Sequence, residues 1–348
     1  MTIATPPAWF PATLAALLEG RDLDGVRMCQ LMHGLLKGEC GEAEMAAVLV
    51  ALRMKGETAT ELAAAAAVLR EHMISFETGR EGVLDTCGTG GDGSGTFNIS
   101  TAAALVAAAA GVPVVKHGNR AMSGRSGSAD VLAALGVQIE GDLACARRCL
   151  DTAGMAFCLA PYFHPALRHI GPVRRRLGVR TLFNCLGPLA NPARASYQLL
   201  GVGWIEWLDR MAVALARLGT RRALLVCGKD GLDEVSLSAP TLVREVNGGK
   251  VISYEWTPAD FGLAPCSLDD LRVEDVEASA ALIRRVLTNE DGPATRMVLA
   301  NAAAALLAAE RVTDLQEGVA LAAEALASGR AQQVLANLRT ASRAGTTA

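Results

Sequence analysis

The chain has 348 residues, of which 51% are hydrophobic, and a formal net charge of −3. This length suits a large α/β domain or two domains, and the apolar content is ample for a buried core. A slightly acidic chain without a basic tail is not expected to bind nucleic acid. The longest apolar stretch, 102–115, is interrupted by Gly111 and Pro113, so we expect no membrane span. Nine cysteines, an odd number without a CxxC pair, predict free thiols and a cytoplasmic location.

The first 75 residues predict an all-helical unit. Apolar residues recur there with helical spacing, and no strand pattern occurs before residue 80. The expected helices cover 14–20, 25–38, 41–53 and 60–73. We expect Thr60 to cap the last of them, which contains an alanine run of high helix propensity.

From residue 82, short apolar runs alternate with amphipathic helical segments. This alternation predicts an α/β fold with a mostly parallel sheet. The expected strands cover 83–86, 112–117, 155–160, 198–202 and 222–227, followed by a pair at 242–246 and 250–256. The segments between these strands and the tail after 276 have helical patterns, and a stretch rich in Arg and Pro, 164–189, interrupts the alternation.

A glycine-rich loop, 87–97, follows the first expected strand and leads into Asn98-Ile99-Ser100-Thr101 at the start of a helix. Glycine lets backbone N–H groups turn toward one point without a Cβ in the way, and a helix N-terminus adds positive potential there. A flexible surface loop would not need to enter an apolar helix directly. The pattern therefore predicts a phosphate-binding loop.

Two other phosphate-binding folds can be weighed against this loop. Gly88, Gly90 and Gly93 match the spacing of a dinucleotide-binding fingerprint, which expects an acidic residue at the end of the second strand. That strand ends in Lys116-His117 instead, and the loop is too long for a direct turn into the helix. A Walker A loop needs Gly-Lys-Ser/Thr, which does not occur in the sequence.

Two further segments follow strand ends, where ligands bind in α/β folds. The loop 116–130 brings positive charge from Lys116 and Arg120 together with a Ser/Gly run that offers amide donors. Asp230, Asp233 and Glu234 follow a later strand, and a group of carboxylates is the kind of site that Mg²⁺ prefers.

Five arginines lie between 168 and 180, within the stretch that interrupts the alternation. They can form a solvated face, or one of them can bind a substrate carboxylate bidentately. Composition alone leaves open which arginine that would be.

Together these segments resemble the anthranilate phosphoribosyltransferase family. The motifs that carry the resemblance are Gly-Thr-Gly-Gly-Asp, Asn-Ile-Ser-Thr, Lys-His-Gly-Asn-Arg, Ser-Gly-Ser-Ala-Asp, Gly-Pro-Val-Arg-Arg, Asn-x-Leu-Gly-Pro-Leu-x-Asn-Pro and Asp-Gly-Leu-Asp-Glu, in the family's order. The resemblance implies a fold of the nucleoside phosphorylase/phosphoribosyltransferase type, with a small helical domain on a larger α/β domain. The helical domain would be 1–75, completed by roughly 164–190, and the α/β domain 80–160 and 195–348. A homodimer joined through the helical domains is also implied.

The resemblance also implies the roles of individual residues. Phosphoribosyl pyrophosphate (PRPP) would lie against Gly88, Gly91, Asp92, Thr96, Asn98, Ile99, Ser100 and Thr101. A second loop would close over it, formed by Lys116, His117, Gly118, Asn119, Arg120, Ala121, Met122, Ser123, Gly124 and Ser128. Two Mg²⁺ ions would be held by Ser100, Asp233 and Glu234, and Asn119 and Arg174 would contact anthranilate. Where Gly124 stands, the family commonly has a second serine.

The implied reaction transfers the phosphoribosyl group of PRPP to the amine of anthranilate and releases pyrophosphate, a step of tryptophan biosynthesis. It requires no covalent nucleophile, because the aromatic amine is neutral and nucleophilic at pH 7. Two rival functions share the fold. A pyrimidine nucleoside phosphorylase would have Lys-x-Ser-Thr-Gly-Gly in its phosphate loop, which is absent here. A non-catalytic nucleic-acid-binding paralogue would be basic and would lack the pair Asp233-Glu234.

Overall fold

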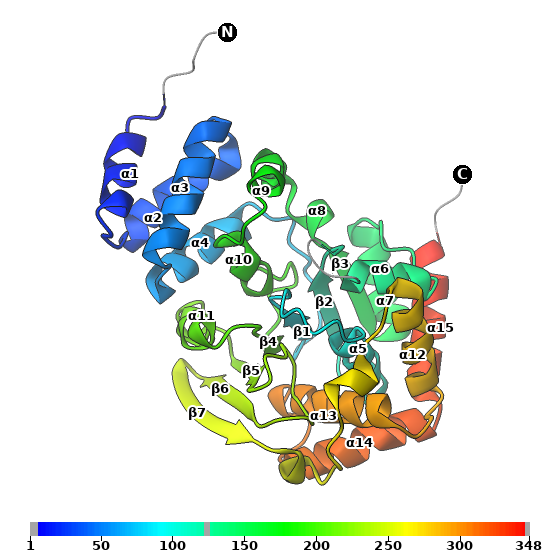
Figure 1. The fold of residues 1–348 in the computed structure, drawn as a ribbon. Helices are drawn as coiled ribbons and strands as arrows, with labels where there is room; N and C mark the ends of the chain where they lie inside the picture. Colours follow the sequence, from blue (N-terminus) through cyan, green and yellow to red (C-terminus); the bar gives the residue numbers. More distant parts are fainter. Residues whose placement is uncertain (1–5, 122–125, 345–348) are drawn as a thin grey trace.

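The computed structural model describes residues 6–121 and 126–344, and its N-terminal part is helical (Figure 1). The first helices lie together at one side of the molecule: α1 (Phe10–Leu18), α2 (Gly25–Lys37), α3 (Glu42–Lys55) and α4 (Ala59–Glu71). Two short helices from the middle of the chain, α9 (Gly171–Leu177) and α10 (Phe183–Leu189), lie beside them (Figure 1), where α9 contacts α3 and α10 contacts α4.

The ends of these helices follow from local side-chain chemistry. α4 is capped by Thr58, whose hydroxyl accepts from the Glu61 amide while the Glu61 carboxylate accepts from the Thr58 amide. The prediction that Thr60 is the cap was therefore wrong, because only Thr58 has a glutamate three residues later to complete this reciprocal pair. α1 begins at Phe10, before the predicted residue 14, since a proline fits the first helical turn.

The larger part is built on a sheet with the strand order β3-β2-β1-β4-β5-β6-β7. The pairs from β3 to β5 are parallel, and β6 and β7 are antiparallel. The strands are β1 (Leu84–Gly88), β2 (Val114–Gly118), β3 (Met155–Leu159), β4 (Tyr197–Gly201), β5 (Arg222–Gly228), β6 (Thr241–Asn247) and β7 (Lys250–Trp256). The prediction of a helical unit and an α/β unit with a mostly parallel sheet is confirmed.

The strand order places a topological switch point at β1 and β4. The chain adds β2 and β3 on one side of β1, and then adds β4 and β5 on the other side. The connections that leave β1 and β4 therefore diverge, and they leave a crevice beyond the carboxyl ends of these strands. The glycine-rich loop leaves β1 at this point.

Helices cover the sheet on both faces, and neighbouring strand residues alternate between two hydrophobic clusters. Leu199 and Leu224 belong to one cluster, whereas Leu200 and Leu225 belong to the other. The remaining helices are α5 (Ile99–Ala109), α6 (Ser128–Ala134), α7 (Leu143–Ala153), α8 (Ala160–Phe163), α11 (Ile205–Arg217), α12 (Val276–Leu287), α13 (Pro293–Ala308), α14 (Leu315–Ala327) and α15 (Arg330–Arg343), with 3₁₀ turns at Pro165–His169, Pro258–Phe261 and Leu268–Leu271.

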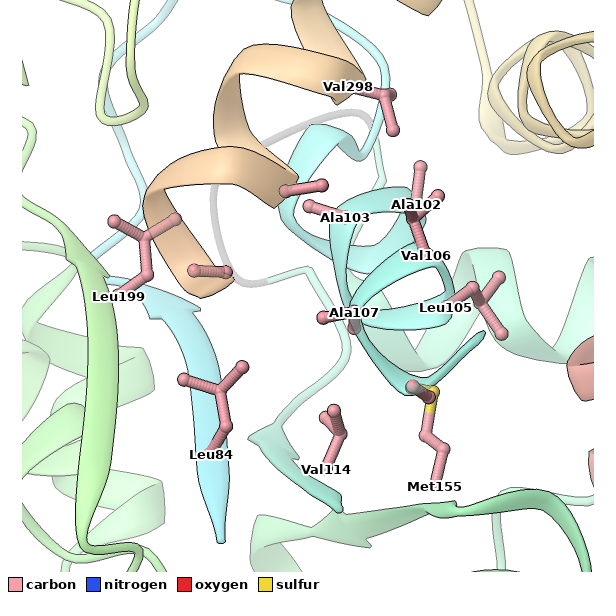
Figure 2. Packing of buried hydrophobic residues seen from close by; sticks show 14 of the residues in the cluster. Leu84, Ala102, Ala103, Leu105, Val106, Ala107, Val114, Met155, Leu199 and Val298 are labelled. Carbon is pink, nitrogen blue, oxygen red and sulfur yellow. The ribbon is translucent and has the colours of Figure 1, made fainter. Parts of the chain in front are cut away.

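The first cluster is centred on the alanine-rich helix α5. Figure 2 shows Leu84, Val114 and Leu199 from the strands below α5, and Val298 from the neighbouring helix α13. Small side chains such as Ala103 let α13 pack closely on α5, which fixes the helix start that follows the glycine-rich loop.

The second cluster joins the two parts of the molecule. It contains residues of α2 and α4 together with Leu186 of α10, Leu208 of α11 and Leu225 of β5. The segment 164–190 is thus packed between the N-terminal helices and the sheet. No helix in the described ranges combines the length and the apolar character that crossing a bilayer requires.

Candidate functional site

A cleft of about 990 Å³ lies at the carboxyl ends of the strands, bounded on one side by the segment 164–190. Most residues predicted to bind substrate or metal line it: Gly88, Gly91, Asp92, Thr96, Asn98, Ile99, Ser100, Lys116, His117, Gly118, Asn119, Arg120, Ala121, Ser128, Arg174, Asp233 and Glu234. Thr101 does not, because its side chain is buried inside the start of α5. Met122, Ser123 and Gly124 lie outside the described residues.

The glycine-rich loop presents a run of open amide donors to this cleft. Gly90, Gly91, Gly93 and Gly95 all have positive φ, which a residue with a Cβ adopts only with strain. Among the described residues, the amides of Gly91, Asp92, Gly93 and Gly95 have no hydrogen-bond partner. Neighbouring amides are used to fix the loop, since the Gly90 amide donates to the Asp233 carboxylate at 3.0 Å. The open amides are the donors that a phosphate group would bind.

We predict that Gly91→Ala weakens the binding of the phosphate-bearing substrate more than that of the other substrate. At φ +74° a Cβ is strained, and it would lie 3.2 Å from the Arg180 guanidinium. The strain costs roughly 1 kcal/mol or more, which corresponds to about a 5- to 10-fold loss of affinity. Calorimetric titration of each substrate measures the effect. Normal binding of both substrates would show that the loop is only a spacer.

An acidic group lies at the base of the cleft. Asp233 and Glu234 follow β5, and Asp92 lies opposite, with its carboxylate 3.5 Å from the Asp233 amide. The Ser100 amide at the start of α5 donates to Glu234 at 3.0 Å. Lys116 at the end of β2 is buried and donates to the Ser100 hydroxyl at 3.2 Å and to the Thr86 carbonyl.

These carboxylates carry more negative charge than the protein around them neutralises. Burial and repulsion from Asp92 and Glu234 raise the pKa of Asp233 well above its usual range. Burial also raises the pKa of Glu234 to about 7, although Lys116 and the Ser100 amide act in the opposite direction. A divalent cation would relieve this repulsion.

The acidic group offers only part of a metal's ligands. It therefore suits Mg²⁺ better than a metal ion whose ligands all come from the protein. Within residues 6–121 and 126–344, no three His, Cys, Asp or Glu side chains form a complete metal-binding group. Mg²⁺ usually takes one or two carboxylates and fills its remaining positions with water and substrate phosphates. Asp233, Glu234 and the Ser100 hydroxyl can supply such a partial set.

Two residues that were not predicted position the acidic pair. Gly201 ends β4, and a Cβ there would lie 1.6 Å from the Asp233 carbonyl oxygen, so only glycine fits. Asn301 of α13 is fully buried; its side chain accepts from the Val235 amide at 2.9 Å and donates to the Val235 carbonyl at 3.0 Å. Two features of the sequence could have indicated these residues: a glycine at a strand end and a lone asparagine within an alanine-rich helix.

The second loop is closed by Asp130, the third residue of α6. Its carboxylate accepts from the amides of Ala121 and Gly127 at 2.8 and 3.1 Å. The Arg120 guanidinium turns away from the cleft to Asp130 and Glu140, at 3.3 and 3.2 Å. A Cβ at Gly118 would lie 2.2 Å from the Ser128 hydroxyl oxygen. The loop therefore offers backbone groups and Lys116 to a ligand, and Arg120 contributes its main chain.

Two buried histidines, His117 and His164, line one part of the cleft, which we call the histidine-lined half. The rings of His117 and His164 lie 4.9 Å apart, and each ring has one nitrogen 3.0 Å from a carbonyl oxygen, of Gly187 and Ala190 respectively. A carbonyl only accepts, so those nitrogens carry the proton. The other nitrogens, Nε2 of His117 and Nδ1 of His164, have no partner among the described residues. Burial lowers the pKa of His117 to about 3 and that of His164 to about 4, so both rings are neutral.

These pKa values predict an acid-dependent loss of stability. Above pH 6.5 both histidines are neutral in the folded and unfolded chains, and their contribution is fully present. Below that pH the unfolded chain binds protons that the folded chain excludes down to about pH 4, so the free energy of unfolding falls by about 1.4 kcal/mol per pH unit for each histidine. Urea unfolding of wild type and His164→Gln from pH 7 to 4.5 tests this. Equal slopes in the two proteins would contradict the assignment for His164.

Arg174 supplies an uncommitted cation to the histidine-lined half. Its guanidinium lies 5.5 Å from the Phe183 ring centroid, and burial lowers its pKa without neutralising it. The guanidinium forms no hydrogen bond or ion pair with the residues that the structure describes. Arg176, by contrast, is exposed and paired with Glu42 of α3. Among these two arginines, Arg174 is the one placed to receive a ligand carboxylate.

Several cleft residues escaped prediction from the sequence because their neighbourhood carries no local motif. They are contributed mainly by the stretch 160–188, which folds over the strand ends: Ala160, His164, Leu167, Arg180, Phe183, Asn184, Leu186, Gly187 and Pro188. The richness of this stretch in Arg and Pro was the available signal, but it did not reveal which side chains face inward.

Comparison with known sequences identifies the same two parts. Residues 80–332 match the glycosyl transferase family, a/b domain, and residues 11–73 match the glycosyl transferase family, helical bundle domain. The chain is 50% identical to the anthranilate phosphoribosyltransferase of Roseiflexus sp. (strain RS-1) over 331 residues, which cover 94% of this chain and 97% of that protein.

Comparison with solved structures also finds anthranilate phosphoribosyltransferases similar to this chain. Anthranilate phosphoribosyltransferase from Thermus thermophilus superposes with a TM-score of 0.89 at 45% identity, covering 95% of this chain and 99% of that one. The enzyme from Saccharomyces cerevisiae in complex with PRPP and Mg has a TM-score of 0.87 at 27% identity, covering 97% and 98%. The yeast enzyme in complex with 4-fluoroanthranilate has a TM-score of 0.86 at 25% identity, covering 97% and 99%.

Proposed function

This chain belongs to the anthranilate phosphoribosyltransferase family, and we propose that the cleft at its strand ends is where it transfers the phosphoribosyl group of PRPP to the amine of anthranilate. The observation that carries the proposal is that one cleft combines open loop amides, an acidic group and an uncommitted arginine. The products are N-(5-phosphoribosyl)anthranilate and pyrophosphate, as in tryptophan biosynthesis.

PRPP would occupy the half of the cleft formed by the glycine-rich loop and the second loop. The open amides of Gly91, Asp92, Gly93 and Gly95 supply donors for phosphate oxygens. Lys116 adds a buried positive charge beside the start of α5. The positions Met122, Ser123 and Gly124 belong to the same proposed binding loop, and Thr101 would act by starting the helix.

The acidic group is proposed to hold magnesium. Asp233, Glu234 and Ser100 would hold it, and two ions would fit the family resemblance. When bound, the metal stabilises negative charge on the pyrophosphate leaving group. Support comes from the raised pKa values of Asp233 and Glu234 and from the complex of the yeast enzyme with PRPP and Mg.

Anthranilate would occupy the histidine-lined half. The Arg174 guanidinium is placed to bind its carboxylate as a planar fork. Asn119 of the second loop also lines the cleft and is proposed to contact the ring substituents. His117 and His164 are neutral, so they do not compete with Arg174 for the carboxylate, and their free nitrogens can accept hydrogen bonds from an amine.

The residues of the cleft account for catalysis without a covalent intermediate. As the bond from the anomeric carbon to pyrophosphate breaks, negative charge grows on the leaving group, where the loop amides and Lys116 stabilise it. The amine nitrogen forms the new bond from the opposite side and then releases its proton to solvent water. Binding of both substrates in one cleft would hold the amine and the anomeric carbon in line, which replaces a bimolecular encounter.

The domain division and assembly are proposed on the same basis. The helical domain would comprise 1–75 completed by 164–190, since both segments contribute to one hydrophobic cluster. A homodimer through the helical domains would cover exposed apolar side chains there, including Leu18, Val26 and Met54. All nine cysteines are free thiols, which supports a reducing, cytoplasmic location.

The direct test of the function is a fluorescence assay. Anthranilate fluorescence should decrease when PRPP and magnesium are present together, and it should remain constant if either is omitted. A nucleoside with inorganic phosphate is the control substrate pair. Phosphorolysis of the nucleoside without consumption of anthranilate would favour the rival enzyme class.

A further inference from the structure

Arg180 joins the segment 164–190 to the glycine-rich loop. Arg180 lies between α9 and α10, and its guanidinium Nη2 donates to the Gly91 carbonyl oxygen at 2.5 Å. Gly91 belongs to the loop that leaves β1, on the opposite wall of the cleft. This contact therefore connects two parts of the chain that approach the cleft from different sides.

Arg180 is held in place by an aromatic ring and not by a carboxylate. Its guanidinium carbon lies 3.2 Å from the centroid of the Trp204 ring, at the start of α11. Within the described residues it forms no ion pair. A planar guanidinium can lie on an indole ring and still donate from its edge, which a lysine ammonium cannot do in the same way. Trp204 thus fixes the plane in which Arg180 donates to Gly91.

The Gly91 carbonyl is a sensitive point of the loop. With φ at +74° and no side chain, this glycine can rotate its neighbouring peptide groups at little cost. The carbonyl of Gly91 and the amide of Asp92 belong to one trans peptide, so they point in opposite directions. A charged donor on the carbonyl therefore also sets the direction of the Asp92 amide, which is one of the open donors of the loop.

We propose that Arg180 is a positioning residue, anchored by Trp204, that holds the glycine-rich loop in the conformation that binds PRPP. The proposal rests on the proposed use of this loop for PRPP. It separates the roles of two cleft arginines. Among the described residues the Arg174 guanidinium has no hydrogen-bond or ion-pair partner and is available to anthranilate, whereas the Arg180 guanidinium is committed to Gly91 and Trp204. Arg180 then acts through the loop and not by touching the reacting atoms.

The proposal predicts a loss of PRPP affinity in variants of both partners. Arg180→Ala should weaken PRPP binding by about 10- to 100-fold, as expected for loss of a hydrogen bond from a charged donor. Trp204→Ala should give a smaller loss in the same direction, and Trp204→Phe, which keeps a ring, should restore binding. The double variant Arg180→Ala/Trp204→Ala should bind PRPP no more weakly than Arg180→Ala, because the two residues act as a unit. The KM for anthranilate should remain unchanged in all of them.

The measurement is calorimetric titration of PRPP with magnesium, together with the KM of each substrate. Arg53→Ala is the matched control, since its guanidinium lies 5.7 Å from the same Trp204 ring but is on α3 and forms no hydrogen bond within the described ranges. Circular dichroism and thermal melting identify variants that fail to fold, and Arg180→Gln provides a second substitution. PRPP binding does not depend on anthranilate turnover, so a wild-type protein that binds PRPP without consuming anthranilate would refute the proposed function alone.

Two results would overturn the role of Arg180. Unchanged PRPP affinity in folded Arg180→Ala and Arg180→Gln would show that the loop does not need this contact. A loss in Arg180→Ala with wild-type behaviour in Trp204→Ala would show that Arg180 acts on the substrate directly, without its aromatic anchor.

Discussion

Replacing both Asp233 and Glu234 with alanine is expected to abolish magnesium-dependent transfer, with a loss in kcat of about 1000-fold or more. The two carboxylates lie at the base of the cleft, where burial and repulsion between acidic side chains raise their pKa values and a divalent cation would be stabilised. Removing them also frees the amides of Gly90 and Ser100, which now donate to Asp233 and Glu234. The measurements are the rate at saturating magnesium and the far-ultraviolet circular dichroism spectrum, which should not change.

A matched control separates this effect from a general loss of negative charge. Glu290 and Asp291 form another adjacent acidic pair, but they are exposed on the surface and paired with Arg285 and Arg296. Their replacement by alanine should leave the rate and its magnesium dependence unchanged. Near-normal activity in the Asp233/Glu234 double variant would refute the metal assignment.

Arg174→Ala is expected to raise the KM for anthranilate by about 10- to 150-fold, the loss associated with a hydrogen bond to a charged group. The KM for PRPP should change little, because the guanidinium lies beside Phe183 and forms no hydrogen bond with the glycine-rich loop in the described ranges. Arg174→Lys should be intermediate, since it keeps the charge but not the planar fork. Initial rates measured against each substrate in turn separate the two KM values.

Arg176→Ala is the control for Arg174, because Arg176 lies two residues later on the same helix and is paired with Glu42 at the surface. It should alter neither KM. An equal rise in both KM values for Arg174→Ala would instead mean that Arg174 holds the walls of the cleft together. The carboxylate partner would then have to be sought among the neighbouring residues.

The parts of the site that lie next to strand ends could be predicted from the sequence. The glycine-rich loop, Lys116 and the pair Asp233-Glu234 each follow an apolar strand, and parallel strands bring their carboxyl ends to one edge. The order of the helices and strands could likewise be predicted from the spacing of apolar residues along the chain. Only local composition and the geometry of parallel sheets were needed for these predictions.

The remaining features depend on contacts between distant segments, which no local pattern encodes. The tight approach of Gly201 to the Asp233 carbonyl joins the end of β4 to the segment after β5, and the stack of Arg180 on Trp204 joins the loop before α10 to the start of α11. Likewise, local composition does not separate Arg176 from Arg174, whereas the ion pair of Arg176 with Glu42 of α3 does. Because the partners of these arginines lie far away in the sequence, the arginine-rich stretch indicated a binding site but not which arginines form it.

The formation of the new carbon–nitrogen bond tests the account most directly. PRPP labelled with ¹³C at the anomeric carbon and anthranilate labelled with ¹⁵N at the amine would be incubated with the protein and magnesium. We predict that a one-bond ¹³C–¹⁵N coupling appears in the wild-type reaction, together with pyrophosphate, and is absent with the Asp233/Glu234 double variant. Release of ribose 5-phosphate without this coupling, or no consumption of PRPP by the wild-type protein, would contradict the account.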